Sequence, residues 1–261
     1  MKKSLIGIAA IATLIATPAL AADMALKAPP AEIWSWTGFY IGANAGDGWA
    51  STEWLNNHIS TCPGNALFTV SSCPTGSQSS NSFIGGGQIG ARVQTGQFVF
   101  GIEGTADYAN FHASTLDPQA FAQGFTIFDG TQLRGLYTAT GQVGAAWDRS
   151  LWYVKGGFAG SSLTQTSTAI AGPTFGAVSH LAYGWTVGTG LDYRVTRNVS
   201  VGLEYDYIRL YAGNASTCTT GAPSVFSCPA PTTPLMFTNF HANANELLIR
   251  ASYNFNWAVS H

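Results

Sequence analysis

The chain has little charge of either sign. Charged residues make up only 9% of its 261 residues, whereas a soluble domain has roughly 25%. Eleven lysines and arginines stand against 13 aspartates and glutamates, so no basic patch is available for binding nucleic acid. Glycine, with 30 residues, and aromatic residues, at 13%, are abundant instead. A surface this poor in charge is typical of a protein that faces lipid.

The chain also lacks long hydrophobic runs after residue 21. The first 21 residues carry Lys2 and Lys3, an apolar run over Leu5–Ala16 and a small-residue site at Ala19–Ala21, which predicts a secretory signal peptide cut after Ala21. A run of about 12 residues is too short for a membrane anchor, which needs roughly 20. Cleavage leaves nine basic and 13 acidic residues, a net charge of −4. Lipid exposure without spanning helices predicts a closed β-barrel, because every backbone N–H and C=O must be paired within the protein.

What the chain does contain is a two-residue periodicity, clearest in Val199–Arg209. Large apolar and aromatic side chains take one parity there, and carboxylates among small residues take the other. Period two indicates a β-strand, and this distribution is typical of a barrel with its polar face inside and its apolar face in lipid. Eight such segments are found, namely Trp36–Gly48, Ser82–Gln94, Phe98–Ala109, Gln132–Trp147, Leu151–Leu163, Ala182–Val195, Val199–Leu210 and Asn243–Trp257.

The connections between these segments alternate between short and long. The short ones are Thr95–Gln97, Asp148–Ser150 and Thr196–Asn198, and the long ones are roughly Ala50–Asn81, Asn110–Thr131, Thr164–Leu181 and Ala212–Ala242. Short periplasmic turns and long external loops are the asymmetry of outer-membrane barrels. We therefore predict an all-β fold, an eight-stranded antiparallel transmembrane β-barrel over residues 36–257. It follows a signal peptide at 1–21 and a periplasmic lead-in at 22–35, and a C-terminal extension at 258–261 comes after it.

Parity predicts which charged side chains point into the barrel. Five are basic and six acidic, namely Arg92, Arg134, Lys155, Arg194, Arg250, Glu103, Asp107, Asp192, Glu204, Asp206 and Glu246. An eight-stranded barrel is just wide enough for side chains to fill it, so these charges must pair or stay hydrated. We expect a salt-bridged plug rather than a wide pore, with Arg194 and Arg250 paired to some of the carboxylates on nearby strands. Arg209 has outward parity, where it either snorkels or contacts lipopolysaccharide phosphates.

The four cysteines lie in two of the predicted external loops, Cys62 and Cys73 in the first and Cys218 and Cys228 in the last. An oxidising periplasm permits any of the three possible pairings. Disulfides within each loop are favoured, because each closes a segment of about 10 residues. The alternative is a bridge between the two loops, which meet where the first and last strands pair.

The segment Trp36–Trp49, WTGFYIGANAGDGW, resembles the small outer-membrane β-barrel proteins of α-proteobacteria, the porin-family or opacity-type surface antigens. Further matches are GGFA at Gly156–Ala159, GWTVGTGLDY at Gly184–Tyr193 and LEYDYI at Leu203–Ile208, and the resemblance covers nearly all of residues 36–257. It implies an OmpA-like barrel in the bacterial outer membrane, with roles in envelope integrity and in environmental or host contact. Some relatives bind haem.

The chain departs from this family pattern at two places. Ala258–His261 follow Trp257, whereas family members commonly end on an aromatic residue that the outer-membrane assembly machinery recognises. Gln142 stands where the family pattern has a basic residue, so one interior ion pair is expected to be missing.

No motif in the chain points to catalysis. His58, His112, His180 and His241 lie in or beside predicted external loops, without the nucleophile and base arrangement of a hydrolase or acyltransferase. We expect a non-enzymatic, monomeric surface barrel without a cofactor. Its expected partners are outer-membrane lipid, lipopolysaccharide and the assembly machinery, but no nucleic acid. The alternatives are a narrow porin for small solutes, a surface receptor binding haem through His58, His112 or His241, and a soluble secreted β-sandwich.

Overall fold

The computed structural model describes residues 34–57, 75–116, 126–169, 174–212, 215–217 and 235–255, all within the compact unit Trp34–His261. The predicted signal peptide, most of the lead-in and the C-terminal extension lie outside these ranges. In order, the described strands are β1 (Gly38–Asn57), β2 (Thr75–Thr95), β3 (Phe98–Leu116), β4 (Ile127–Trp147), β5 (Ser150–Ala169), β6 (Thr174–Arg194), β7 (Val199–Ala212), β8 (Ala215–Thr217) and β9 (Leu235–Phe255). No helix in the described part of the chain is both long enough and apolar enough to cross a membrane.

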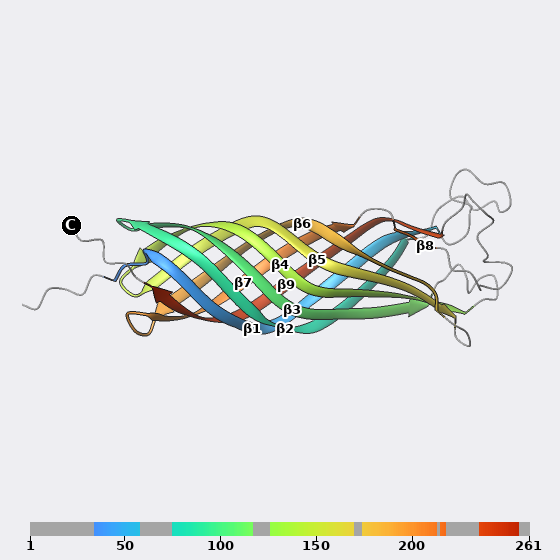
Figure 1. The fold of residues 1–261 in the computed structure, drawn as a ribbon, viewed down its shortest axis with the longest axis horizontal. Coiled ribbons are helices and arrows are strands. Elements are labelled where there is room, and N and C mark those ends of the chain that lie inside the picture. The colour runs from blue at the N-terminus through green and yellow to red at the C-terminus, as the bar shows by residue number, and fades with distance from the viewer. Residues whose placement is uncertain are drawn as a thin grey trace, which may run out of the picture. The chain divides into compact units, whose positions relative to one another are not determined.

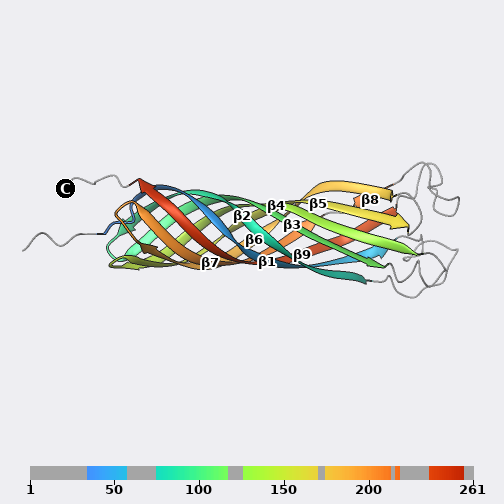
Figure 2. The ribbon, with the colours of Figure 1, turned by 90° about the horizontal axis from the view of Figure 1, so that it is seen from below.

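Eight of these strands form a closed antiparallel barrel, which confirms the predicted fold class. Each strand from β1 to β7 pairs with its neighbour in sequence, β7 pairs with β9, and β9 returns to pair with β1. The first and last strands therefore lie side by side, as the blue and red ribbons of Figure 1 show. The short β8 pairs only with the start of β9, at Leu235–Phe237. The tilt of the strands around the barrel is clearest in Figure 2.

The barrel strands are longer than predicted. Seven of them have 19 to 21 residues and β7 has 14, although roughly 10 residues suffice to cross a membrane. The predicted long connection Thr164–Leu181 is mostly strand, because β5 continues to Ala169 and β6 begins at Thr174. The extensions of β2 and β5 escaped the periodicity because they are rich in serine and threonine, which leave no apolar face to recognise.

Three short turns lie at one end of the barrel, which we call the turn end. The connections β1–β2, β3–β4 and β7–β9, which are longer, and the four-residue connection β5–β6 lie at the opposite, loop end. Gly96 and Asp148 take left-handed backbone conformations in the first two turns, with φ of 60° and 53°. Both residue types tolerate this conformation. In the third turn, the Val199 N–H donates to Thr196 Oγ1 over 3.0 Å. All three turns fall within a residue of the predicted positions.

Two apolar clusters lie inside the barrel, one on each side of its polar centre. Trp36, Val99, Ala146, Leu151 and Tyr153 form the cluster near the turn end. The cluster toward the loop end, here called the apolar layer, contains Ala50, Ile84, Ala109, Phe111, Leu133, Leu136, Ala159, Leu163, Ala182, Ile208, Leu210, Ala212, Phe240, Ala242, Ala244 and Leu248. Apolar side chains packed across the lumen exclude water. The apolar layer was not predicted, since the sequence indicated a salt-bridged plug.

Candidate functional site: the charged interior

Side chains from all eight barrel strands meet in the polar centre of the barrel. Ten of the eleven side chains predicted to point inward are buried there, namely Arg92, Glu103, Asp107, Lys155, Asp192, Arg194, Glu204, Asp206, Glu246 and Arg250. Their inward direction follows from strand parity, because successive side chains of a strand point to opposite faces. Glycines at Gly86, Gly188 and Gly202 face three of the carboxylates, Asp107, Asp206 and Asp192 respectively, and leave room for them.

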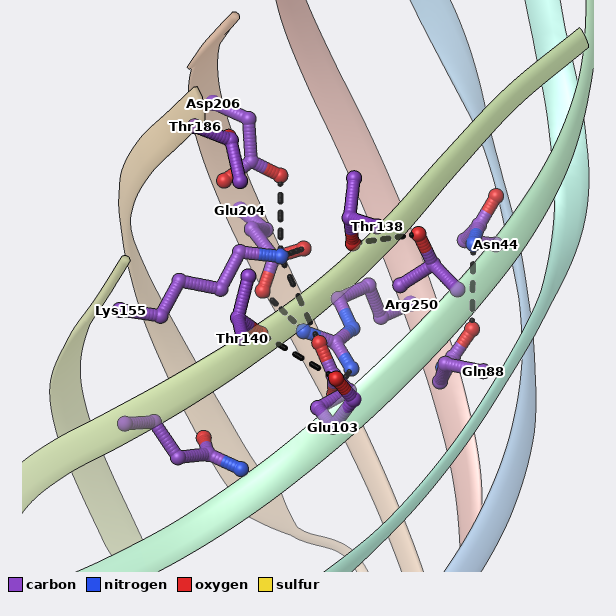
Figure 3. Close-up of polar contacts among 12 residues, drawn as sticks. Asn44, Gln88, Glu103, Thr138, Thr140, Lys155, Thr186, Glu204, Asp206 and Arg250 are labelled. Carbon is purple, nitrogen blue, oxygen red and sulfur yellow. Dashed lines mark hydrogen bonds and ion pairs between the residues drawn. The ribbon is translucent and has the colours of Figure 1, made fainter. Parts of the chain in front are cut away.

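Two cations and two glutamates form the middle of this network. The Arg250 guanidinium contacts both Glu103 and Glu204. Lys155 Nζ lies 2.7 Å from Glu204 Oε1 and 3.4 Å from Glu103 Oε1. Each glutamate therefore shares both cations, as the dashed lines in Figure 3 show. Sharing offsets the cost of burying four charges, since a charge removed from water must be paired and hydrogen-bonded.

Two tyrosines complete the hydrogen bonding of the glutamates. Tyr40 Oη donates to Glu103 Oε2 over 2.7 Å, and Tyr153 Oη donates to Glu204 Oε2 over 2.5 Å. The sequence reading did not assign Tyr40 or Tyr153 to the site. The signal for Tyr153 was present, because it shares its parity with Lys155 two residues later on β5.

A branch of the network runs from this centre toward the turn end through Arg92. Its guanidinium donates to Asp192 Oδ2 over 2.9 Å and to Gln142 Oε1 over 3.2 Å, while Gln142 Nε2 donates to Tyr40 Oη over 2.8 Å. Gln142 thus links Arg92 to Tyr40 by hydrogen bonds at the position where the resemblance led us to expect a base. The Arg92 guanidinium also lies over the Tyr40 ring, 4.4 Å from its centroid, a favourable cation–π arrangement.

Trp36 fills the interior at the turn end. Its side chain is 1% exposed, and the Arg194 guanidinium lies 4.4 Å from the centroid of its ring. The backbone N–H of Trp36 donates to Gln94 Oε1 over 2.8 Å, and the backbone N–H of Gln94 donates to Thr37 Oγ1 over 2.9 Å. These bonds hold the chain before β1 across the end of the barrel. Besides stacking on the Trp36 ring, the Arg194 guanidinium donates a hydrogen bond to the Arg197 carbonyl over 2.5 Å.

The buried charges are less balanced than predicted. Among the described residues, seven acids are buried, the six predicted ones and Asp129, against four buried bases. Asp206 and Glu246 are opposite one another in the pairing of β7 with β9. Lys155 Nζ lies 3.1 Å from Asp206 Oδ2, whereas Glu246 Oε1 and Asp206 Oδ1 have no hydrogen-bond partner among the described residues. Within those residues, no group of three or more histidine, cysteine, aspartate or glutamate side chains is arranged to hold a metal ion.

The prediction for Arg134 was wrong, because its side chain is exposed on the outside of β4. The cause is Gly135, whose φ of 66° lies in the left-handed region and whose position coincides with register shifts against both neighbouring strands. A bulge of this kind inserts one residue and exchanges the two faces of the strand beyond it. The bulge also explains why Asp129 is buried. Asp129 was expected in a loop, but it lies on β4 beyond the bulge, where the exchanged faces turn its side chain inward.

Among the described histidines, only His180 points toward the interior: it shares the inward parity of Ala182 on β6, and both of its ring nitrogens are buried without a hydrogen-bond partner among the described residues. Cys62, Cys73, Cys218, Cys228 and His58 lie outside the described residues, so the proposed disulfides stay predictions. His112 is exposed on β3, and His241 on β9 makes an edge contact with the Tyr211 ring at 5.3 Å between centroids. His112 and His241 lie on strands that are not adjacent.

Comparison with known proteins places this geometry in a family. Residues 18–256 match the family model described as outer membrane protein beta-barrel domain. The chain is 27% identical over 212 residues to the 25 kDa outer-membrane immunogenic protein of Brucella canis, covering 78% of this chain and 83% of that one. It is 29% identical over 217 residues to the 31 kDa outer-membrane immunogenic protein of Brucella melitensis biotype 1, with 78% and 85% covered. Among solved structures, OprG of Pseudomonas aeruginosa matches 85% of this chain and 98% of its own, with a TM-score of 0.47 and 12% identity.

Proposed function

The chain belongs to the outer membrane β-barrel domain family, and from this premise we propose that it is a non-enzymatic surface barrel that contributes to envelope integrity and to environmental or host contact. It is an outer-membrane protein, similar to the immunogenic outer-membrane proteins of Brucella. Its proposed partners are outer-membrane lipid, lipopolysaccharide and the barrel assembly machinery, and we propose that it acts as a monomer.

One observation carries this proposal: the buried ion network lies between two apolar clusters inside the barrel. A solute crossing the barrel would have to separate Arg250 and Lys155 from their glutamates and then displace the apolar layer. Both steps are costly in a closely packed interior. The filled interior therefore supports a structural barrel over the alternative of a narrow porin.

The second alternative, a haem-binding surface receptor, has less support from the described residues. His112 and His241 lie on separate strands, and the His241 ring already contacts Tyr211. His112 and His241 therefore do not supply two facing axial ligands to one haem. The function therefore rests on the barrel and on what it displays at its loop end.

A deletion strain tests the proposed role in the envelope. Loss of the protein is expected to increase sensitivity to dodecyl sulfate with EDTA, because the outer membrane loses a rigid barrel and its lipid contacts. Expression of the full chain should restore resistance, measured as the minimal inhibitory concentration of the detergent. Unchanged sensitivity in the deletion strain would contradict the proposed role.

A further inference from the structure

The outward face of β3 and β4 shows where the membrane boundary lies. Large outward side chains run from Phe98 to Tyr108 on β3 and from Trp147 to Tyr137 on β4. These stretches of about 11 residues, at about 3.4 Å per residue and a tilt of about 40°, span about 26 Å along the membrane normal. That is the height of the apolar band of an outer-membrane barrel. Tyr108 and Tyr137, 66% and 52% exposed, therefore lie at the boundary, where tyrosine is favoured.

Polar side chains begin immediately beyond these two tyrosines. Arg134 is opposite Asn110 in the pairing of β3 with β4, and Gln132 is opposite His112 in the next outward pair. We call these four side chains the β3–β4 patch. Because this end carries the long connections, it faces the cell exterior. The patch therefore lies at the level of the outer-leaflet headgroups.

The patch presents donors that point to an anion. The Arg134 guanidinium is exposed and makes no hydrogen bond or ion pair with the described residues. Gln132 Nε2 donates to Asn110 Oδ1 over 2.5 Å, which leaves the Asn110 amide N–H groups to donate beside Arg134. The carboxylates on the described parts of β3 and β4, Glu103, Asp107 and Asp129, are all buried inside the barrel. No described carboxylate of β3 or β4 therefore lies on the outward face, where it would repel a bound anion.

We propose that the β3–β4 patch binds a phosphate group of the lipopolysaccharide in the outer leaflet, with Arg134 as its main ligand. A guanidinium binds phosphate through two parallel hydrogen bonds, and the apolar belt below the patch would hold the acyl chains of the same lipid. The Gly135 bulge serves this site, because without it Arg134 would point into the barrel. The inference rests on the proposed contact with lipopolysaccharide and not on the closed interior.

Lipid A binding by the full-length protein in detergent tests the site, with native mass spectrometry reporting the bound fraction. Arg134→Ala is expected to weaken binding of diphosphorylated lipid A about tenfold, and Arg134→Lys to weaken it less, because lysine keeps the charge without the paired geometry. Binding of dephosphorylated lipid A should not change. Arg197→Ala is the matched control, since it removes the same charge at the turn end. Heat-modifiable migration on a gel establishes that every variant is folded.

Three outcomes would overturn the proposal. If Arg134→Ala binds diphosphorylated lipid A as well as the wild type does, the protein binds lipopolysaccharide but not through the β3–β4 patch. If the wild type itself does not bind lipid A, the lipopolysaccharide contact fails as well. If inorganic pyrophosphate alone is retained as tightly as lipid A, the patch is a soluble-anion site and not a lipid site.

Discussion

Among single residues, Arg250 is the one on which the pairing of the interior charges depends most. It contacts Glu103 and Glu204 from opposite strands and donates to Tyr153 Oη over 2.7 Å. Lys155 alone cannot replace it, because Lys155 also faces Asp206. The buried acids already outnumber the buried bases, so the loss of one base leaves a carboxylate without compensation in a medium of low dielectric constant.

Arg250→Ala is therefore expected to reduce the free energy of unfolding by about 3–5 kcal/mol, the usual cost of breaking a buried ion pair from one side. Guanidinium unfolding in lipid vesicles measures this loss. The exposed Arg134→Ala is the matched control and should change stability by less than about 0.5 kcal/mol. A double-mutant cycle between Glu204→Gln and Arg250→Met should give a coupling energy of about 1–3 kcal/mol. Zero coupling would show that the pair contributes nothing.

At the scale of strands, Gly135 determines the direction of every side chain in the outer part of β4. Its φ of 66° is strained for any residue with a Cβ, and an added Cβ would lie 3.0 Å from Tyr137 Oη. The bulge buries Leu133 and Asp129 and exposes Arg134. One glycine thus sets both the apolar layer and the outward patch on this strand.

Gly135→Ala is expected to destabilise the barrel by about 1–2 kcal/mol, because alanine is strained in the left-handed region. Gly141→Ala on the same strand is the control. An added Cβ there meets no atom within 4 Å, so we expect no loss or a slight gain, since glycine weakens a strand interior. Equal effects of the two substitutions, measured by guanidinium unfolding, would argue against the bulge.

The strands also show what the sequence could predict. The apolar outward face of Val199–Arg209 recurs in all eight barrel strands, so parity predicted the fold class, the turns and ten of the eleven buried charges. Parity failed at Arg134, because a bulge shifts the pattern by one residue and Gly135 looks like any other glycine in a barrel strand. It also failed at the serine- and threonine-rich ends of β2 and β5, where neither face is apolar.

The packing of side chains across the barrel could not be predicted from the sequence. Phe111 on β3, Leu163 on β5 and Phe240 on β9 meet in the apolar layer from strands far apart in the chain. Phe111 and Phe240 belonged to segments that were expected to form loops. Their meeting depends on register and on closure of the barrel, which a single strand's pattern does not contain.

For the molecule as a whole, the main consequence of this packing is that the barrel interior is closed. The charged side chains of the ion network come from six of the eight barrel strands, Tyr40 on β1 and Gln142 on β4 complete its hydrogen bonds, and the network lies between the two apolar clusters. Because the interior is closed, the inner and outer faces of the barrel have different roles. The interior stabilises the barrel, and contact with lipid and with the environment takes place on the outward face and at the loop end.

Planar-bilayer recording of the purified full-length protein tests whether the interior is closed to ions. We predict no stepwise conductance at moderate voltage in molar salt, because an ion would have to cross the apolar layer. A triple variant, Phe111→Ala, Leu163→Ala and Phe240→Ala, removes the three side chains named above and provides the comparison, since it should conduct more than the wild type. Stable ohmic steps from the wild-type barrel, equal to those of the triple variant, would contradict the closed interior.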